Sequence, residues 1–163
     1  MRGRIRLAFA LVFVIGAVSD GADLQYKDRL LETLVEKVPG ILDTFDSETG
    51  RFGTGIWICR DQHPMYPLAV AYSTEADGNP YYEDPELLAV IVKAGDPLLK
   101  NMDERGQWIF AKKDGSTWGM IWMPWTYSRW IRTFQLIEDR MPPEARTVWA
   151  DALALGNTGS SKS

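Results

Sequence analysis

Residues 84–102, DPELLAVIVKAGDPLLKNM, decide the fold class of this chain of 163 residues. Apolar side chains recur there at spacings of three and four, which is the pattern of a helix with one buried face. Asp84 is placed to cap this helix, and Pro85 and Glu86 suit its first turn. Pro97 lies within the apolar stripe and predicts a kink, because proline has no N–H to donate to the preceding turn.

The same apolar spacing predicts helices on both sides of this stretch. The expected ranges are 26–45 with a kink or interruption at Pro39-Gly40, from 64–67 through Tyr72, from Pro124 to about Arg140, and from Pro143 to Gly156. Residues 51–63 are expected to be irregular or short extended chain, 107–110 a short extended stretch, 112–116 a polar loop and 118–125 an irregular aromatic loop. Since no run alternates like the strands of a sandwich or a parallel sheet, we predict an all-α fold.

The two ends of the chain differ from the rest in composition. Three arginines precede an apolar run from Leu7 to Val18, and small residues stand at 17 and 19, where a signal peptidase reads its site. Residues 1–19 are therefore predicted to be a secretory signal peptide, and the protein to be exported, periplasmic or secreted. The run is shorter than the roughly 20 residues that span a bilayer, so we expect no stable membrane insertion after its removal; a retained N-terminal anchor is the alternative. Residues 157–163 are small and polar and predict a disordered tail, which leaves 20–156 as the folded domain.

Charge and rare residues exclude several function classes. The formal net charge is −4, and removal of the arginine-bearing leader would make the protein more acidic, so we expect no nucleic-acid binding. The chain holds one histidine, His63, and one cysteine, Cys59. A zinc site of Cys and His ligands needs three or four such residues, and one cysteine forms no internal disulfide. We therefore predict no metal site and no cofactor.

A first polar constellation occupies residues 60–67, RDQHPMYP, next to the start of a predicted helix. It contains Arg60, Asp61, Gln62, His63 and Tyr66. Asp61 and His63 are suited to share a proton, and Arg60 to bind a substrate carboxylate through two hydrogen bonds. In the alternative interpretation Asp61 caps the helix and His63 fills a core position.

A second constellation is aromatic. The chain has seven Trp residues, and five of them fall within 108–130. Trp and Tyr rings stack on the apolar face of a sugar, and an Arg among them suits a uronate or a sulfate. The candidate substrate-binding residues are Trp57, Trp118, Trp122, Trp125, Tyr127 and Arg129. The alternative is that these rings fill a helical core. The charge run Lys112-Lys113 is expected to be a solvated loop without a role.

Three blocks of the sequence resemble a known family. They are GRFGTGIWICRDQHPMYPLAVAYS (50–73), YYEDPELLAVIVKAGDPLLKNMDERGQW (81–108) and KKDGSTWGMIWMPWTYSRWIRTFQLIEDRMPPEARTVWADAL (112–153). They look like the amino-terminal helical part of exported bacterial proteins of the heparinase II/III-like group, which are (α/α)-toroid polysaccharide lyases and their relatives. The resemblance covers about residues 26–156.

The resemblance implies an incomplete (α/α) toroid of about four or five helices, with irregular aromatic loops that line a sugar groove. It implies that His63 or Tyr66 acts as base or acid and that Arg60 or Arg129 neutralises a uronate carboxylate. The rest of such a toroid and the following β-sandwich domain are missing from this chain. We therefore expect a missing C-terminal domain or self-association to cover its apolar face.

Three functions are compatible with these patterns. The leading hypothesis is an exported carbohydrate-active segment that binds an acidic, uronate-containing polysaccharide or oligosaccharide, or cleaves it by β-elimination. The alternative is a non-catalytic sugar-binding or interaction module, or an inactive fragment of a longer protein. A hydrolase of unsaturated uronides is the third, because fold does not fix function.

Overall fold

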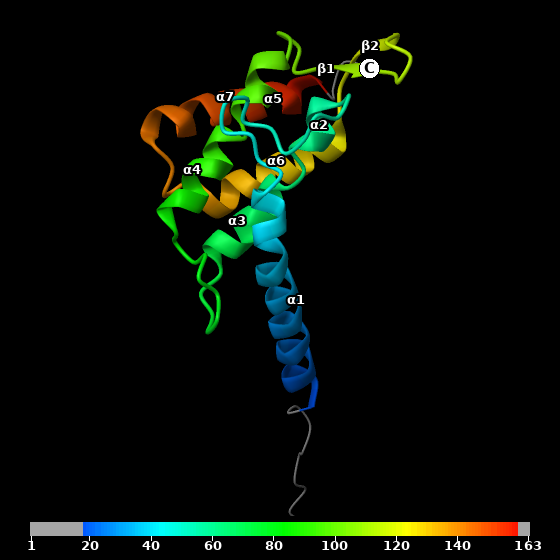
Figure 1. Ribbon diagram of the computed structural model, residues 1–163. Coiled ribbons are helices and arrows are strands. Elements are labelled where there is room, and N and C mark those ends of the chain that lie inside the picture. The colour runs from blue at the N-terminus through cyan, green and yellow to red at the C-terminus, as the bar shows by residue number, and fades with distance from the viewer. Residues whose placement is uncertain (1–17, 160–163) are drawn as a thin grey trace, which may run out of the picture.

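The computed structural model describes residues 18–159 and the side chains of residues 25–156 (Figure 1). Its elements are α1 (Val18–Leu42), α2 (Ile58–Asp61), α3 (Met65–Ser73), α4 (Pro85–Lys93), α5 (Asp96–Asn101), β1 (Trp108–Ala111), β2 (Thr117–Ile121), α6 (Pro124–Ile137) and α7 (Pro143–Gly159). The chain is mostly helical, which confirms the helical prediction at that level. Of the predicted signal peptide, only residues 18 and 19 are described, and they begin α1.

Helix α3 lies at the centre of the helical body. It packs against α6, α4 and α1, and α6 packs in turn against α7. Leu68, Ile91, Trp130 and Trp149 are among the side chains that these helices bury almost completely. Burial of each such side chain contributes about 1.5–3 kcal/mol, so this cluster supplies much of the stability of the fold.

The stretch 84–102 forms two helices rather than one kinked helix. Asp84 caps α4 as predicted, because its Oδ1 accepts a hydrogen bond from the Glu86 amide at 3.0 Å. The helix ends at Lys93, and α5 restarts at Asp96, with Pro97 in its first turn. Gly95 in the joint approaches Trp149 so closely that an added Cβ would lie 2.3 Å from Cζ2 of that ring.

Helix α1 continues through Pro39 to Leu42, so the expected interruption at Pro39-Gly40 is wrong. Pro39 has no N–H to donate, but its carbonyl still accepts a hydrogen bond from the Asp43 amide at 2.9 Å. Val38 is fully buried, and Ile41 packs against the core, so the segment is held in place on both sides of the proline. In Figure 1, the first part of α1 projects away from the body.

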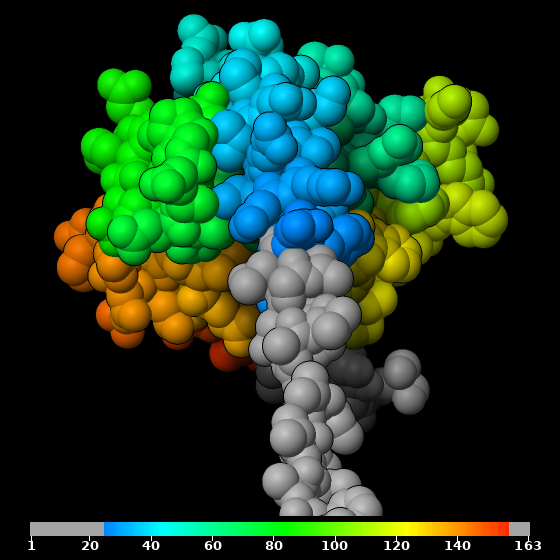
Figure 2. Space-filling model, turned by 90° about the horizontal axis from the view of Figure 1, so that it is seen from below, coloured from blue at the N-terminus to red at the C-terminus, as the bar shows by residue number. Residues whose placement is uncertain are grey.

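The aromatic stretch is the main difference from the predicted all-α fold. Residues 108–110 are extended as expected, but residues 118–121 belong to β2, which pairs with β1 in an antiparallel hairpin. The expectation of an irregular loop there was wrong because the polar loop 112–116 makes a tight turn, in which the Lys112 amide donates to the Ser116 carbonyl at 2.7 Å. Seen from below in Figure 2, the hairpin protrudes from one side of the body.

Helix α7 extends to Gly159, although we expected it to end at Gly156. Residues 157–159 therefore belong to the helix and not to a tail, and residues 160–163 lie outside the described part. Gly156 does not end the helix. It allows a close contact with Tyr127, since an added Cβ would lie 2.0 Å from Cε1 of that ring. Among the described helices, none has the length and apolar composition needed to cross a bilayer.

Candidate functional site

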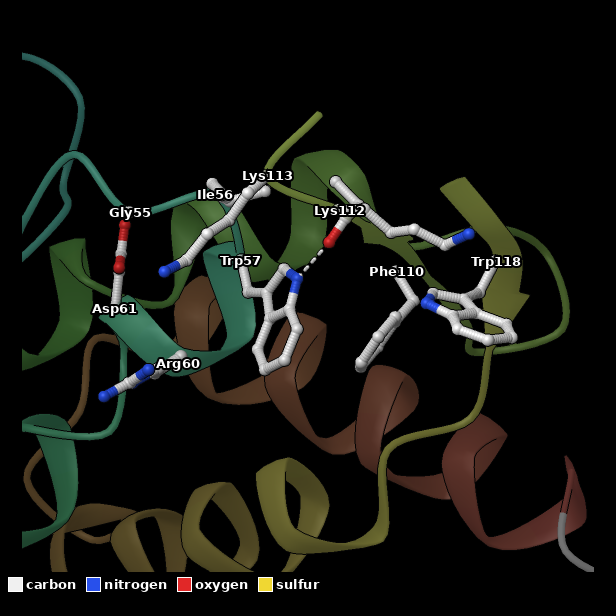
Figure 3. Close-up of a pocket in the computed structure, with 10 residues that line it drawn as sticks. Gly55, Ile56, Trp57, Arg60, Asp61, Phe110, Lys112, Lys113 and Trp118 are labelled. Carbon is white, nitrogen blue, oxygen red and sulfur yellow. Dashed lines mark hydrogen bonds between the residues drawn. The ribbon is translucent and has the colours of Figure 1, made fainter. Parts of the chain in front are cut away.

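A pocket of about 610 Å³ lies between the segment 55–61 and the hairpin (Figure 3). Its lining residues are Gly55, Ile56, Trp57, Arg60, Asp61, Phe110, Ala111, Lys112, Lys113 and Trp118. The two sides of the pocket come from parts of the sequence about fifty residues apart. Pockets of this volume are typical of small-molecule sites.

Aromatic rings form the middle of the pocket. Trp57, which precedes the first turn of α2, packs on Phe110 of β1 with ring centroids 4.3 Å apart. Its Nε1–H donates a hydrogen bond to the Ala111 carbonyl, and this bond ties the start of α2 to the hairpin (Figure 3). Trp57 therefore has a fixed orientation and presents part of its ring to the pocket.

Trp118 is the most exposed aromatic ring among residues 25–156, with 66% of its surface accessible. The Lys112 Nζ lies 4.2 Å from the centroid of this ring, which is a cation–π contact. The strand pairing is irregular at Trp118 itself: Ala111 pairs with Thr117, and Ile109 pairs with Met120, so β2 holds one residue more than β1 between these pairs.

This extra residue makes a β-bulge, and Gly119 in the bulge has a positive φ of 89°, a conformation that favours glycine. The Gly119 amide donates to the Thr117 hydroxyl at 2.8 Å, which closes the bulge. Bulges reorient the side chains of the strand that contains them. The pairing of Ala111 with Thr117 places Phe110 and Trp118, the next residue of each strand, on the same side of the hairpin, and the bulge holds the backbone from which Trp118 projects.

Three cations line the pocket without an acidic partner. No carboxylate of the described residues lies within ion-pair distance of Arg60, Lys112 or Lys113. Figure 3 shows the Lys112 side chain extending toward Trp118 and the Lys113 side chain extending in the other direction, toward Asp61 and Arg60. Positive charge thus stands at both ends of the aromatic centre.

The one acid of the pocket, Asp61, is already paired. Its Oδ2 accepts a hydrogen bond from the Arg51 guanidinium, which also donates to the Gly55 carbonyl at 2.6 Å. An added Cβ at Gly55 would lie 2.3 Å from Asp61 Oδ1, so glycine is needed for this approach. The two sequence interpretations, in which Asp61 shares a proton with His63 or caps α3, are therefore both wrong. Because the charge of Asp61 is neutralised by Arg51, the pocket remains net positive.

Four of the predicted site residues meet in this pocket: Trp57, Arg60, Asp61 and Trp118. Two others are core residues, which corrects their assignment to substrate binding. Gln62 is 3% exposed, and its Nε2 donates to the Gly50 and Ala94 carbonyls. Tyr127 is also 3% exposed and donates to the Gly106 carbonyl at 2.8 Å. The sequence could not separate these two roles, because a polar side chain near an aromatic cluster can hydrogen-bond a backbone carbonyl as readily as a ligand.

The remaining predicted residues lie outside the pocket. Trp122 donates to the Gly156 carbonyl at 2.9 Å and stacks on Tyr127. Trp125 is 48% exposed at the start of α6, and Tyr66 is half-buried in α3. Neither of these two lines the pocket.

His63 and Arg129 do come together, but around a small cavity of about 10 Å³ that they share with Gln62. A cavity of that size has no room for a sugar ring. Burial and the nearby Arg129 and Arg60 guanidinium groups lower the pKa of His63. The neighbouring Cys59 is buried, and this burial raises the pKa of its thiol to about 12, so it is an unreactive thiol.

Sequence reasoning missed Phe110, Lys112 and Lys113. The two lysines had been assigned to a solvated loop. A signal for them was present, because a polar turn between two short apolar runs predicts a hairpin, and a hairpin brings residues before and after its turn together. Among the described residues, no group of His, Cys, Asp and Glu is arranged to hold a metal ion.

No protein-family model, curated protein sequence or solved structure matches this chain. The resemblance to the heparinase II/III-like group therefore stays a prediction, and the function has to be argued from the pocket.

Proposed function

We propose that this chain binds an acidic oligosaccharide, one that carries uronate carboxylates or sulfates, in the pocket between the segment 55–61 and the hairpin. The observation that carries the proposal is a group of three cations, Arg60, Lys112 and Lys113, that have no acidic partner among the described residues and lie around the aromatic rings of the pocket. A sugar ring stacks its apolar face on an aromatic ring, and its acidic substituent pairs with Arg or Lys. A neutral apolar ligand would leave the three cations unused.

The distribution of charge favours a ligand with more than one acidic group. Lys112 and Lys113 extend to opposite ends of the pocket, and Trp57 and Phe110 lie between (Figure 3). A single anion reaches one end only, whereas a chain with acidic groups on separate sugars reaches both. We therefore favour an oligosaccharide of several acidic residues over an acidic monosaccharide.

Binding without cleavage is the form of this function that we favour. β-Elimination needs a base within reach of the proton next to a neutralised carboxylate. Arg60 lines the pocket, but His63 and Tyr66, to which the resemblance assigned the base, do not. The sugar-binding module thus has more support than the lyase. Export, predicted from residues 1–19, belongs to the same proposal.

A place for these helices in an (α/α) toroid is also a proposal. It has the support of the successive packing of α3 on α4 and α6 and of α6 on α7. The toroid is tested by a structure of this chain extended by any residues that its reading frame encodes after Ser163. We expect further antiparallel helix pairs that continue the ring and cover apolar side chains such as Val148 and Leu136. A downstream product of a different fold contradicts the toroid.

Calorimetric titration tests the binding function. We expect a 4-linked uronate tetrasaccharide to bind, and the same tetrasaccharide with its carboxylates reduced to alcohols to bind at least about tenfold more weakly, a difference of about 1.4 kcal/mol. Trp118→Ala and Arg60→Gln should each weaken binding about fivefold to tenfold, because one such contact contributes about 1 kcal/mol. A sulfated oligosaccharide of the same length shows which acid is preferred.

Matched control variants separate the pocket from the rest of the surface. Trp125→Ala removes a similarly exposed indole, and Arg132→Gln removes an exposed guanidinium, both outside the pocket. Neither should change the affinity. Equal binding of the acidic and the reduced tetrasaccharide, or equal loss in pocket and control variants, contradicts the proposal. Release of an unsaturated uronide during incubation would instead support cleavage by β-elimination.

A further inference from the structure

Buried polar atoms without partners gather around the small cavity between α2, α3, α5 and α6. Five buried side-chain nitrogen and oxygen atoms of the described residues have no hydrogen-bond partner. Four of them belong to residues that line this one cavity: Gln62 Oε1, His63 Nε2, Trp130 Nε1 and Thr126 Oγ1, the last of which also lies beside the Cys59 thiol. Gln62, Thr126 and Trp130 are each at least 97% buried. Since buried polar groups are nearly always paired, four at one place need a common explanation.

The four atoms match the hydrogen-bonding capacity of a single water molecule. Trp130 Nε1–H is a donor only, and the Thr126 hydroxyl also donates. Gln62 Oε1 is an acceptor, and His63 Nε2 is an acceptor when the ring is neutral with its proton on Nδ1. The lowered pKa of His63 favours that neutral form at pH 7. A water molecule accepts two hydrogen bonds and donates two, which matches the two donors and two acceptors of this group.

The size of the cavity fits one water molecule as well. Its volume of about 10 Å³ is close to the least that a water molecule needs, and it leaves no room for a larger ligand. Internal waters in proteins commonly make about three hydrogen bonds to otherwise unpaired groups. Apolar cavities stay dry, but this one has polar atoms on the turn after α2 and on α6.

We propose that this cavity is a specific binding site for one structural water molecule, held by Gln62, His63, Thr126 and Trp130. The site is separate from the sugar pocket and does not depend on the function proposed for it. The water joins the turn that follows α2 to α6 in the core. Because α2 carries Arg60 and Asp61, the water also fixes the position of one wall of the pocket.

A high-resolution crystal structure of the full chain tests the proposal directly. We expect one peak of solvent density in the cavity, within hydrogen-bond distance of at least three of the four atoms. A cavity without density, in a map that resolves other ordered waters, overturns the proposal. So does a rearranged core in which the four atoms find partners within the protein.

Water contact in solution is a second readout, measured as the nuclear Overhauser effect between water and indole N–H protons. We expect an effect at Trp130 and none at Trp108, whose equally buried indole donates to the Leu98 carbonyl at 2.9 Å. Thr126→Val removes an exchangeable hydroxyl proton but leaves three partners for the water, so the Trp130 effect should persist. No effect at Trp130 in the unmodified protein, or its loss in Thr126→Val, counts against the water.

Discussion

At the scale of single residues, His63 shows how the surroundings of a side chain change its chemical role. The only imidazole of the chain was a natural candidate for a base. In the fold, burial and the Arg129 and Arg60 charges lower its pKa, while Asp61 opposes this shift without cancelling it. His63 Nε2 faces the core and not the pocket. A residue chosen for its reactivity is thus better explained as a neutral member of an internal polar cluster.

The lowered pKa of His63 makes stability depend on pH. The unfolded chain binds a proton at the ordinary pKa of 6.5, and the folded chain binds it only at lower pH. Between these two values the unfolded state holds more protons, so the free energy of unfolding falls as the pH drops below about 6.5. Denaturant unfolding at about pH 7.5 and about pH 5.5 should show this loss. His63→Gln, which does not titrate, should lose less on acidification; an equal loss in both proteins contradicts the assignment.

At the scale of the elements, glycine has opposite roles in two helices. Gly156 in α7 lies against Tyr127, where an added Cβ would meet ring atoms at 2.0 Å. Gly40 in α1 has no atom within 4 Å of an added Cβ. Helix propensity favours Ala over Gly at both positions by about 1 kcal/mol, so only the packing distinguishes them.

We therefore expect Gly156→Ala and Gly40→Ala to change stability in opposite directions. Gly40→Ala should raise the free energy of unfolding by about 0.5–1 kcal/mol, because Ala loses less conformational entropy. Gly156→Ala should lower it by about 1 kcal/mol or more, since an overpacked core costs more than the helix gains. Urea unfolding of both variants measures the difference. Stabilisation by both substitutions would show that Tyr127 moves aside freely.

The bulge in β2 gives a second prediction for an element. Gly119 has a φ of 89°, and a side chain there costs about 1–2 kcal/mol. Gly119→Ala should therefore loosen the bulge, displace Trp118 and weaken binding of the acidic tetrasaccharide. Gly78→Ala is the matched control, because Gly78 has a φ of 81° in a loop outside the pocket. It should lose similar stability and keep its affinity. If Gly119→Ala binds the tetrasaccharide with unchanged affinity, the bulge does not determine the orientation of Trp118.

At the scale of the whole molecule, charge is unevenly distributed. The chain carries a formal net charge of −4, yet its pocket is positive. The opposite sign gathers in a groove between α1 and the loop 76–79, which includes Asp28, Glu32, Glu36 and Asp77. An acidic ligand is thus repelled by the molecule as a whole and attracted at one place.

This distribution predicts how binding depends on salt. At high ionic strength, attraction over more than about 5 Å is screened, and the exposed cations of the pocket lose part of their effect. We expect the affinity for the acidic tetrasaccharide to fall about tenfold between about 50 mM and about 500 mM salt. Lys113→Gln should reduce this dependence, whereas Glu32→Gln, in the acidic groove, should not. An affinity that is independent of salt argues for a purely aromatic contact.

The sequence by itself determined most of the longer helices, because their signals are local, but it did not predict α2, which lies in a stretch expected to be irregular or extended. Asp84 and Pro85 fixed the start of α4, and apolar spacings of three and four positioned α3 and α6 close to where they lie. Only the tertiary structure decided which residues form the pocket, since Trp57 and Arg60 meet Phe110 and Trp118 across a distance in sequence that no periodicity encodes. It also separated exposed Trp118 from buried Tyr127, nine residues away. The physical reason is that burial depends on what packs opposite a side chain, and that partner comes from elsewhere in the chain.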